Sequence, residues 1–231
     1  MKIPVSPRLL ACCDFISPGD RVADIGCDHG YLGIYLLSKG IASSIIASDI
    51  RNEPLQCAVR NSAKFGVQDK ITFHLSDGVQ NIPRDFDTLV CAGMGGDTMV
   101  SILSSAPWLK DKRYRLILQC QSKTPTLRKY LHDSGWRILE ERVLRDGRFL
   151  YTVMEVVPYG GYPLTPGECH FPPALLENPS AEVPAYYRWV VGGLEISINN
   201  QGRNADPWKA KALEELKNLP PELSWLKEDS L

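Results

Sequence analysis

Three acidic residues occupy matching places in the sequence, near the ends of short apolar runs. Asp24 lies near the end of the run 22–25, Asp49 ends the run 44–49, and Asp77 follows a third run. Because the carboxyl ends of parallel strands meet where sheets bind ligands, we expect these carboxylates to converge on one crevice. Carboxylates so placed can accept hydrogen bonds from an ammonium group, from two ribose hydroxyls and from the exocyclic amine of adenine. Independent caps or turns are the alternative.

A glycine-containing turn follows the first of these acids. Asp24, Gly26 and Gly30 form the pattern D-x-G-x-x-x-G, and the glycines would let the backbone approach a ligand closely. The pattern differs from the G-x-G-x-x-G of dinucleotide sites, in which backbone amides receive a pyrophosphate. S-adenosylmethionine has no pyrophosphate, but it has an ammonium group, a carboxylate and an adenosyl group. The pattern therefore predicts an S-adenosylmethionine site that uses Asp24, Gly26, Gly30, Asp49, Asp77 and Gly78.

A second glycine-rich segment, Ala92–Asp97, follows the fourth apolar run. Its three glycines in four residues allow close approach at the place where such folds present a substrate to the methyl donor. We expect Gly93 and Met94 to contact the cofactor and Gly95 and Gly96 to contact the substrate. A flexible connection before the next helix is the alternative. The absence of D-P-P-Y or N-P-P-Y here disfavours the usual amino-group DNA and RNA methyltransferases.

Side chains around a fifth apolar run offer contacts to a nucleic acid. The segment 110–148 contains eleven Lys and Arg against five Asp and Glu, whereas the whole chain has a net charge of −1. Gln119 ends the run, where it can bond a base edge or, equally well, satisfy the amides of a loop. Four cations precede the run and are candidates for phosphate contacts, with a solvated surface as the alternative: Lys110, Lys112, Arg113 and Arg115.

The elements that must position these residues alternate along the chain. Such alternation requires crossover connections, and therefore predicts a Rossmann-like, mostly parallel sheet with helices on both faces. Runs at 136–143 and 149–157 flank a turn and predict an antiparallel hairpin that completes the sheet. The expected strands are 22–25, 44–49, 70–75, 87–92 and 114–119, and helices are expected at 7–16, at 52–65, from Asp97, and from Thr124 or Thr126 to Gly135.

A proline-rich segment divides the chain. Residues 158–184 contain seven prolines and three glycines, which suits an irregular connector. Residues 1–157 are expected to form the cofactor-binding catalytic domain, and residues 185–231 a small helical hairpin.

The hairpin prediction comes from two patterns. An apolar stripe between Val183 and Ile198 indicates one helix, and Asp206–Pro207 provides an N-cap and first turn for a second helix, joined through 199–205. Gly192 and Gly193 lie inside the first helix, where each costs about 1 kcal/mol relative to alanine.

Composition and residue spacing indicate whether the chain is folded, where in the cell it is expected, and whether it binds a metal. A hydrophobic content of 44% is normal for a globular core and disfavours disorder. No apolar run approaches the ~20 residues that span a bilayer, and the N-terminus lacks the apolar stretch of a signal peptide, so we expect a cytoplasmic protein without membrane contact. The seven cysteines form no C-x-x-C pair and the four histidines lack metal-ligand spacing, so no metal is expected.

Two motifs resemble those of a known family. The segment 23–32, A-D-I-G-C-D-H-G-Y-L, and the A-G-M-G-G loop at 92–96 resemble the bacterial tRNA (adenine-N1) methyltransferases of the TrmK family, which act on adenosine 22. The resemblance extends from the S-x-R-L of residues 6–9 to about residue 157. Cys27 and Cys120 stand where serine and proline are expected, and neither change removes a proposed charge.

The resemblance implies methyl transfer from S-adenosylmethionine to N1 of an adenine in tRNA, with Arg8 among the substrate-binding residues. Neutral adenine N1 has an available lone pair, so its alignment with the methyl donor matters more than a strong base. The methylated ring is cationic. Asp28 is therefore a candidate for stabilising it, and His29 and Tyr31 are candidate base contacts, although each of the three can be structural.

Two other functions remain compatible with the sequence. One is a methyltransferase for a small molecule or a protein, which the basic segment 110–148 slightly disfavours. The other is a noncatalytic RNA-binding module that retains an adenosyl pocket. The family also carries a C-terminal helical domain, but here the tail looks short and residues 182–217 hold five basic and five acidic side chains, which argues against a strong electrostatic grip on RNA.

Overall fold

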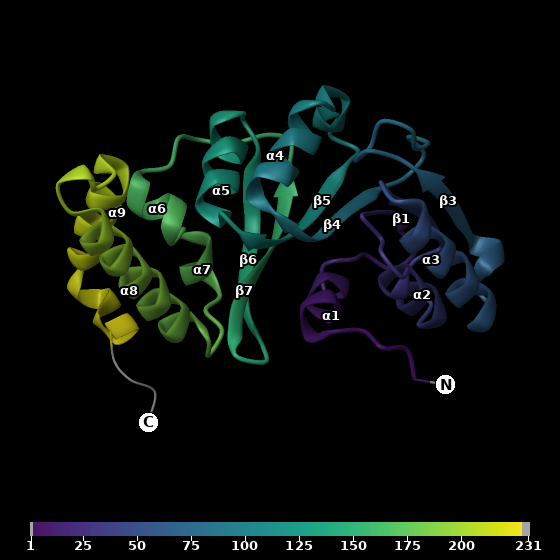
Figure 1. The fold of residues 1–231 in the computed structure, drawn as a ribbon, viewed down its shortest axis with the longest axis horizontal. Helices are drawn as coiled ribbons and strands as arrows, with labels where there is room; N and C mark the ends of the chain where they lie inside the picture. Colours follow the sequence, from purple (N-terminus) through teal and green to yellow (C-terminus); the bar gives the residue numbers. More distant parts are fainter. Residues whose placement is uncertain (1, 228–231) are drawn as a thin grey trace.

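A seven-stranded sheet forms the centre of the molecule (Figure 1). The computed structural model describes residues 2–227, so Met1 and residues 228–231 of the expected segments lie outside it. The strands are β1 (Arg21–Ile25), β2 (Ser44–Asp49), β3 (Ile71–Leu75), β4 (Thr88–Gly95), β5 (Arg115–Ser122), β6 (Arg137–Asp146) and β7 (Phe149–Val157). Their order is β3-β2-β1-β4-β5-β7-β6, with β1 to β5 parallel and β7 antiparallel to both neighbours. The predicted Rossmann-like, mostly parallel sheet is confirmed.

Helices cover both faces of this sheet (Figure 1). They are α1 (Pro7–Cys13), α2 (Tyr31–Ser38), α3 (Asn52–Lys64), α4 (Gly96–Ser104) and α5 (Thr124–Asp133), with single 3-10 turns at Gln68–Lys70 and Pro107–Lys110. Side chains of β1 alternate between the faces: Ala23 and Ile25 pack in the cluster that contains α4 and α5, and Val22 packs with α1, α2 and α3. This two-residue period is what a strand buried on both sides requires.

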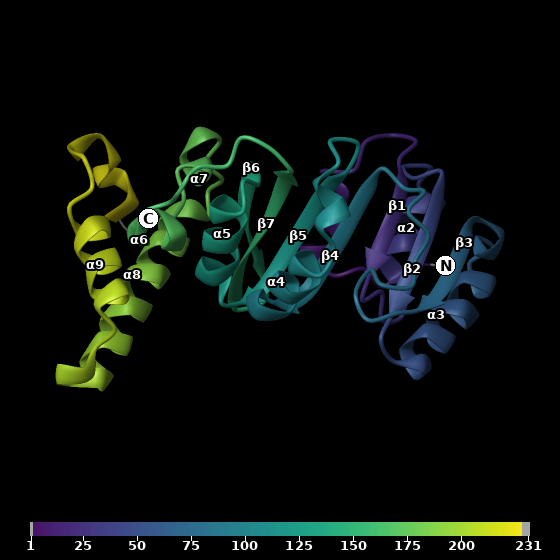
Figure 2. The same cartoon turned by 90° about the horizontal axis from the view of Figure 1, so that it is seen from above.

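The C-terminal part is mostly helical, and α8 and α9 lie side by side beyond β6 (Figure 2). Its helices are α6 (Pro166–His170), α7 (Ala174–Glu177), α8 (Val183–Gln201) and α9 (Pro207–Lys217), with 3-10 turns at Gly202–Asn204 and Pro221–Lys227. The segment expected to be an irregular connector thus contains two short helices. Pro166 occupies the first turn of α6, where its missing N–H costs nothing, and Thr165 and Glu168 form a capping box.

Arg128 of α5 joins the sheet to this helical part. Its side chain is fully buried, and its five N–H groups all donate: two to Glu141 of β6 at 2.6 and 3.2 Å, two to the carbonyls of Cys169 and His170, and one to the Tyr186 hydroxyl of α8 at 3.1 Å. A buried guanidinium is tolerated only when its charge is paired and its donors are satisfied. The C-terminal helices α6 and α8 therefore provide three of the five acceptors that Arg128 needs.

Apolar contacts also cross the expected boundary at 158–184. Val143 and Leu150 of the sheet pack in one cluster with Phe171, Val190 and other side chains of the C-terminal helices. We therefore propose that segments 1–157, 158–184 and 185–231 unfold as one cooperative unit. No helix among residues 2–227 combines the length and apolar character that crossing a membrane requires.

Replacing Arg128 tests this coupling. Arg128→Met is expected to lower the free energy of unfolding by about 3 to 5 kcal/mol, because Glu141 is left buried without its partner. The double variant Arg128→Met/Glu141→Leu removes both charges and should recover part of the loss. Urea unfolding, followed by circular dichroism and by tryptophan fluorescence, measures the change and should show one transition with both probes.

Lys129→Met is the control, because Lys129 pairs with Asp133 on the exposed side of α5 and its removal should change stability little. Unchanged stability of Arg128→Met, or separate transitions for the two probes, would contradict the proposed coupling.

Candidate active site

A crevice lies at the carboxyl ends of the strands, where the strand order reverses between β1 and β4. Ligands bind at such reversal points in sheets of this class. The crevice has a volume of about 440 Å³, and we call it the strand-end crevice. Eight residues singled out from the sequence line it: Arg8, Gly26, Asp28, Asp49, Asp77, Gly78, Gly93 and Met94.

A smaller cavity of about 80 Å³ adjoins the strand-end crevice and shares Arg8, Gly26 and Asp28 with it. Three further predicted residues line this side cavity: Asp24, His29 and Tyr31. The first turn after β1 thus contributes to both spaces.

Asp24 is the most perturbed acid of the site. Its side chain is 4% exposed, and its Oδ2 has no hydrogen-bond partner among the described residues. Burial, with a further contribution from nearby Asp49, raises the pKa of the Asp24 carboxyl to about 7, although a hydrogen bond from the Gly33 amide acts in the opposite direction. An unpaired acceptor in a buried place is costly, so a cationic donor that enters here would be stabilised.

Asp49 is also buried, and the backbone on both sides of the crevice fixes its orientation. Its two carboxylate oxygens accept from the amide of Arg51 at 2.9 Å and from the amide of Asp28 at 3.2 Å. Asp28 has a positive φ of 50°, which turns its amide toward Asp49. Each oxygen of Asp49 retains capacity for a further donor, which suits a pair of neighbouring hydroxyls.

The two glycines of the turn after β1 have different structural roles. Gly26 has a φ of +73°, a conformation that favours glycine, and a β-carbon there would lie 2.2 Å from Cε of Met94, so a larger residue would also displace the Met94 side chain. Gly30 lines neither cavity. A β-carbon at Gly30 would lie 2.9 Å from Cβ of Ala58, which shows that Gly30 permits the close packing of α2 against α3.

Gln119 holds the glycine-rich end of β4 in place. The side chain is fully buried, and its Oε1 accepts both from Nη1 of Arg8 at 3.1 Å and from the amide of Gly93 at 3.0 Å. Of the two roles left open by the sequence, the structure shows the glutamine that satisfies loop amides. It also holds Arg8 at the wall of both cavities, a contact between residues 111 apart that no local pattern reveals.

Asp28 and His29 lie at the rim of the site, with side chains 61% and 51% exposed. Nε2 of His29 is 3.7 Å from Oδ2 of Asp28, and the rings of His29 and Tyr31 are 6.0 Å apart. Gly95 ends β4 and Gly96 begins α4, and they lie against Ser122, the last residue of β5, and Lys123, which follows it. Among residues 2–227, no three or more His, Cys, Asp and Glu side chains are grouped to hold a metal ion.

The basic run before β5 lies at the other edge of the sheet, because residues that precede a parallel strand lie opposite its carboxyl end. Its side chains also have partners in the protein. Arg115 pairs with Asp20 at 2.9 Å and with Glu155 at 3.1 Å. The others have partners as well: Arg113 donates to the Tyr114 hydroxyl, Lys110 to the Ser134 carbonyl, and Lys112 lies over the Tyr159 ring.

Some residues of the strand-end crevice carried no signal in the sequence. Arg51, Thr98 and Ile102 line it beside the predicted acids. Arg51 directly follows Ile50 after the acid that ends β2, and that position after a strand is the one feature that could have identified it.

Comparisons with known proteins agree with this geometry. Residues 5–154 match the methyltransferase domain family. The tRNA (adenine(22)-N(1))-methyltransferase of Bacillus subtilis is 32% identical over 157 residues, which cover 66% of this chain and 65% of that protein. The matched segment therefore spans just under two thirds of this curated relative.

Solved structures resemble the fold over more of the chain. The crystal structure of the B. subtilis m1A22 tRNA methyltransferase TrmK superposes with a TM-score of 0.78 at 26% identity, covering 98% of both chains. A Streptococcus pneumoniae protein in complex with S-adenosyl-L-methionine superposes with a TM-score of 0.81 at 27% identity, covering 92% of this chain and 98% of that one. The chain therefore belongs to the methyltransferase family, and the resemblance to the TrmK-type tRNA methyltransferases is confirmed.

Proposed function

We propose that this chain transfers the methyl group of S-adenosylmethionine to N1 of an adenine in tRNA, at position 22 as the name of its B. subtilis relative specifies. The observation that carries the proposal is the buried, unpartnered Oδ2 of Asp24 beside Asp49 and the A-G-M-G-G loop. The similarity to tRNA methyltransferases over most of the chain supports the choice of substrate.

The residues present fit S-adenosylmethionine. The orphaned carboxylate oxygen of Asp24 suits the ammonium group, and Asp49 suits the two ribose hydroxyls. Asp77 and Gly78 follow β3 at the end of the crevice where an adenine amine would find an acceptor. When bound, the cofactor supplies a methyl group on a positively charged sulfur.

The glycine-rich end of β4 is where we expect the acceptor base to lie. Met94 contacts Gly26 and lines the crevice, so Gly93 and Met94 bound the space next to the methyl group. Arg8, held by Gln119, lies at the junction of the crevice and the side cavity, where it can contact the RNA. Holding adenine N1 in line with the donor supplies most of the acceleration, because the neutral nitrogen needs no base.

Charge changes during the transfer. Methylation at N1 would leave the adenine ring cationic, so a carboxylate near the ring would stabilise the product side of the reaction. Asp28 is placed for this at the rim shared by both cavities, and His29 and Tyr31 provide flat surfaces for the base. N1 lies on the Watson–Crick edge, so a paired adenine must leave its helix before it reaches Asp28.

Methylation of tRNA is the direct test. Labelled S-adenosylmethionine, incubated with the protein and bulk tRNA from cells that lack it, is expected to label the tRNA, and nucleoside analysis should find 1-methyladenosine. Label in protein or in small molecules would instead support a methyltransferase that acts on those substrates. A ribosomal protein L11 methyltransferase of Thermotoga neapolitana is 28% identical, so this alternative is worth testing. Cofactor binding without any transfer would support the noncatalytic alternative.

The raised pKa of Asp24 predicts a pH dependence of cofactor binding. The ammonium group favours the ionised carboxylate, and Asp24 is mostly protonated below its pKa of about 7. Affinity should therefore rise with pH between about 5.5 and 7, approaching tenfold per unit at the acidic end. Calorimetry across this range measures the slope, and Asp24→Asn should bind more weakly at about pH 7.5 and lose the slope. A variant that keeps the same pH profile would remove Asp24 from the site.

Asp28 and Asp49 should separate catalysis from cofactor binding. Asp28→Asn is expected to lower kcat by about a hundredfold while the affinity for S-adenosylmethionine changes little, because its backbone contact to Asp49 remains. Asp49→Ala should weaken cofactor binding, since each charge-assisted hydrogen bond is worth about 1.5 to 3 kcal/mol. Single-turnover rates and calorimetry measure the two effects, and a normal rate in Asp28→Asn would assign that residue a structural role.

A further inference from the structure

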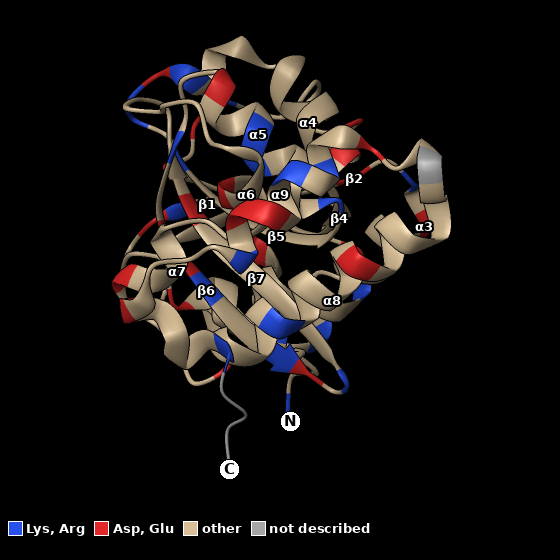
Figure 3. Ribbon diagram, turned by 90° about the vertical axis from the view of Figure 1, so that its left-hand side faces the viewer, with Lys and Arg blue, Asp and Glu red and all other residues tan. Residues whose placement is uncertain are grey.

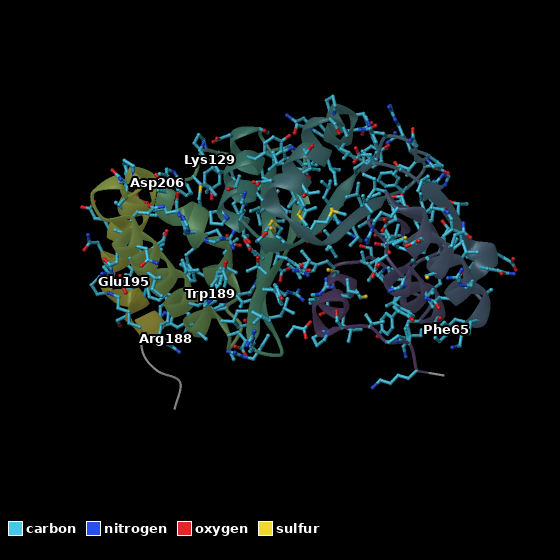
Figure 4. The ribbon with its side chains drawn as sticks, viewed as in Figure 1. Phe65, Lys129, Arg188, Trp189, Glu195 and Asp206 are labelled. Atoms are coloured by element: carbon cyan, nitrogen blue, oxygen red, sulfur yellow. The ribbon has the colours of Figure 1, made fainter. Side chains whose placement is uncertain are left out.

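A second cavity lies between the sheet and α8, outside the strand-end crevice. It has a volume of about 240 Å³ and is bounded by the end of β5 and the start of α5, by β7, by one side of α8, and by single residues of α6 and α9. We call it the hairpin cavity. Trp189 of α8, which Figure 4 labels, lines this space.

The walls of the hairpin cavity suit a flat ring. Tyr151 of β7 and Trp189 of α8 line it, and the Trp189 ring stacks on Tyr186 with centroids 5.8 Å apart and an angle of 29°. Trp189 nevertheless remains 62% exposed, so one large aromatic surface is available to a ligand. Pockets for drug-sized ligands are about 300 to 1,000 Å³, so a cavity of 240 Å³ suits a single ring system.

Two lining residues carry buried polar atoms without partners among the described residues. Thr152 is 2% exposed and its Oγ1 has none, and Nε2 of His170 also has none. Burial lowers the pKa of His170 to about 4, so its ring is neutral and can donate or accept. Buried groups of this kind call for a polar partner, which a ligand with donors and acceptors on its edge provides.

The charged side chains that line the hairpin cavity are cations. Lys123 pairs with Asp97, Lys209 donates to Ser197, and no acidic residue lies among the described residues of the lining. Figure 3 shows that Lys and Arg are elsewhere mixed with Asp and Glu on this side of the molecule, so the absence of acids is a property of the cavity itself. A neutral ring attached to a phosphate matches this lining.

The hairpin cavity is one strand away from the strand-end crevice. Met94 of the crevice pairs in the sheet with Cys120 of the hairpin cavity, and Gly95 pairs with Ser122. Neighbouring strands lie about 4.8 Å apart. A β-carbon at Gly96 would lie 2.4 Å from the Lys123 carbonyl, so glycine allows the two loops to touch. A chain that delivers one base to Met94 can reach the hairpin cavity with a neighbouring base.

Gly193 lies inside α8, where a glycine weakens the helix relative to other residues. It lines the hairpin cavity, and a β-carbon there would meet no atom within 4 Å. We expect a larger side chain at this position to take up part of the cavity, because Gly193 belongs to its wall. Gly192 is equally free of neighbours but lines a different groove, with Tyr187 and Glu195. The two glycines therefore form a matched pair for an experiment.

We propose that the hairpin cavity binds an unstacked nucleobase of the RNA substrate, next in the chain to the base that is methylated. This inference rests on the proposed function, because that function supplies the RNA. Removing a base from its helix leaves its neighbours unstacked, and RNA-binding proteins commonly hold such bases on aromatic side chains. Trp189 provides the stacking surface, and Thr152 and His170 bond the edge of the base.

Filling the cavity tests the proposal. Gly193→Leu is expected to raise the KM for tRNA at least tenfold, within the tenfold to hundredfold range that the loss of one stacked base produces. Gly192→Leu should leave KM within about twofold of the parent. Both variants should keep the affinity for S-adenosylmethionine and a Tm no lower than the parent, because leucine favours a helix more than glycine does.

A second measurement does not depend on methyl transfer. Saturation-transfer NMR with uridine 5′-monophosphate, which lacks the adenine that the methylation site accepts, on protein saturated with S-adenosylmethionine, should detect nucleotide binding in the parent and in Gly192→Leu but not in Gly193→Leu. An unchanged KM in Gly193→Leu, or nucleotide binding that persists in it, would overturn the proposal. If the parent methylates no tRNA, the proposed function fails, whereas nucleotide binding that only Gly193→Leu abolishes still supports the cavity as a base site.

Discussion

The buried guanidinium of Arg128 is the constraint on which the arrangement of the two halves depends. Its five donors need five acceptors in a place that water does not reach, and these come from β6, from the end of α6 and from α8. Movement of α8 away from the sheet would leave one N–H of Arg128 and the hydroxyl of Tyr186 without their partners. The helical hairpin is therefore held at a fixed distance from β5 and β7, and the hairpin cavity exists because that distance is fixed.

The strand-end crevice and its side cavity differ from this arrangement, because they contain polar groups that the protein does not satisfy. Asp24 has an unpartnered oxygen and a pKa raised to about 7, and Asp49 adds a second carboxylate nearby. Such an arrangement is unfavourable in the empty protein and becomes favourable when a cation enters. The paired charge of Arg128 stabilises the fold, whereas the unsatisfied carboxylate of Asp24 is available for binding.

Features that follow from short stretches of sequence could be predicted, whereas features that depend on contacts between distant residues could not. The strands and the positions of Asp24 and Asp49 follow from apolar runs and from the rule that strand ends converge. The role of Gln119 depended on Arg8, more than a hundred residues away, and the helices of the connector depended on Thr165 and the prolines after it. The basic run before β5 was grouped by charge alone, although its place before a strand assigns it to the edge opposite the crevice.

The charge of the hairpin bears on how it can contribute to RNA recognition. Residues 182–217 hold five basic and five acidic side chains, so the hairpin exerts little net attraction on phosphates. Stacking of a base needs an aromatic surface and no net charge, and α8 presents Trp189 for that purpose. A hairpin that acts through shape would select RNA in which the bases beside the target are already unstacked, such as a loop or a distorted helix. The part of its contribution that comes from stacking would then depend less on salt than that of a phosphate-binding surface.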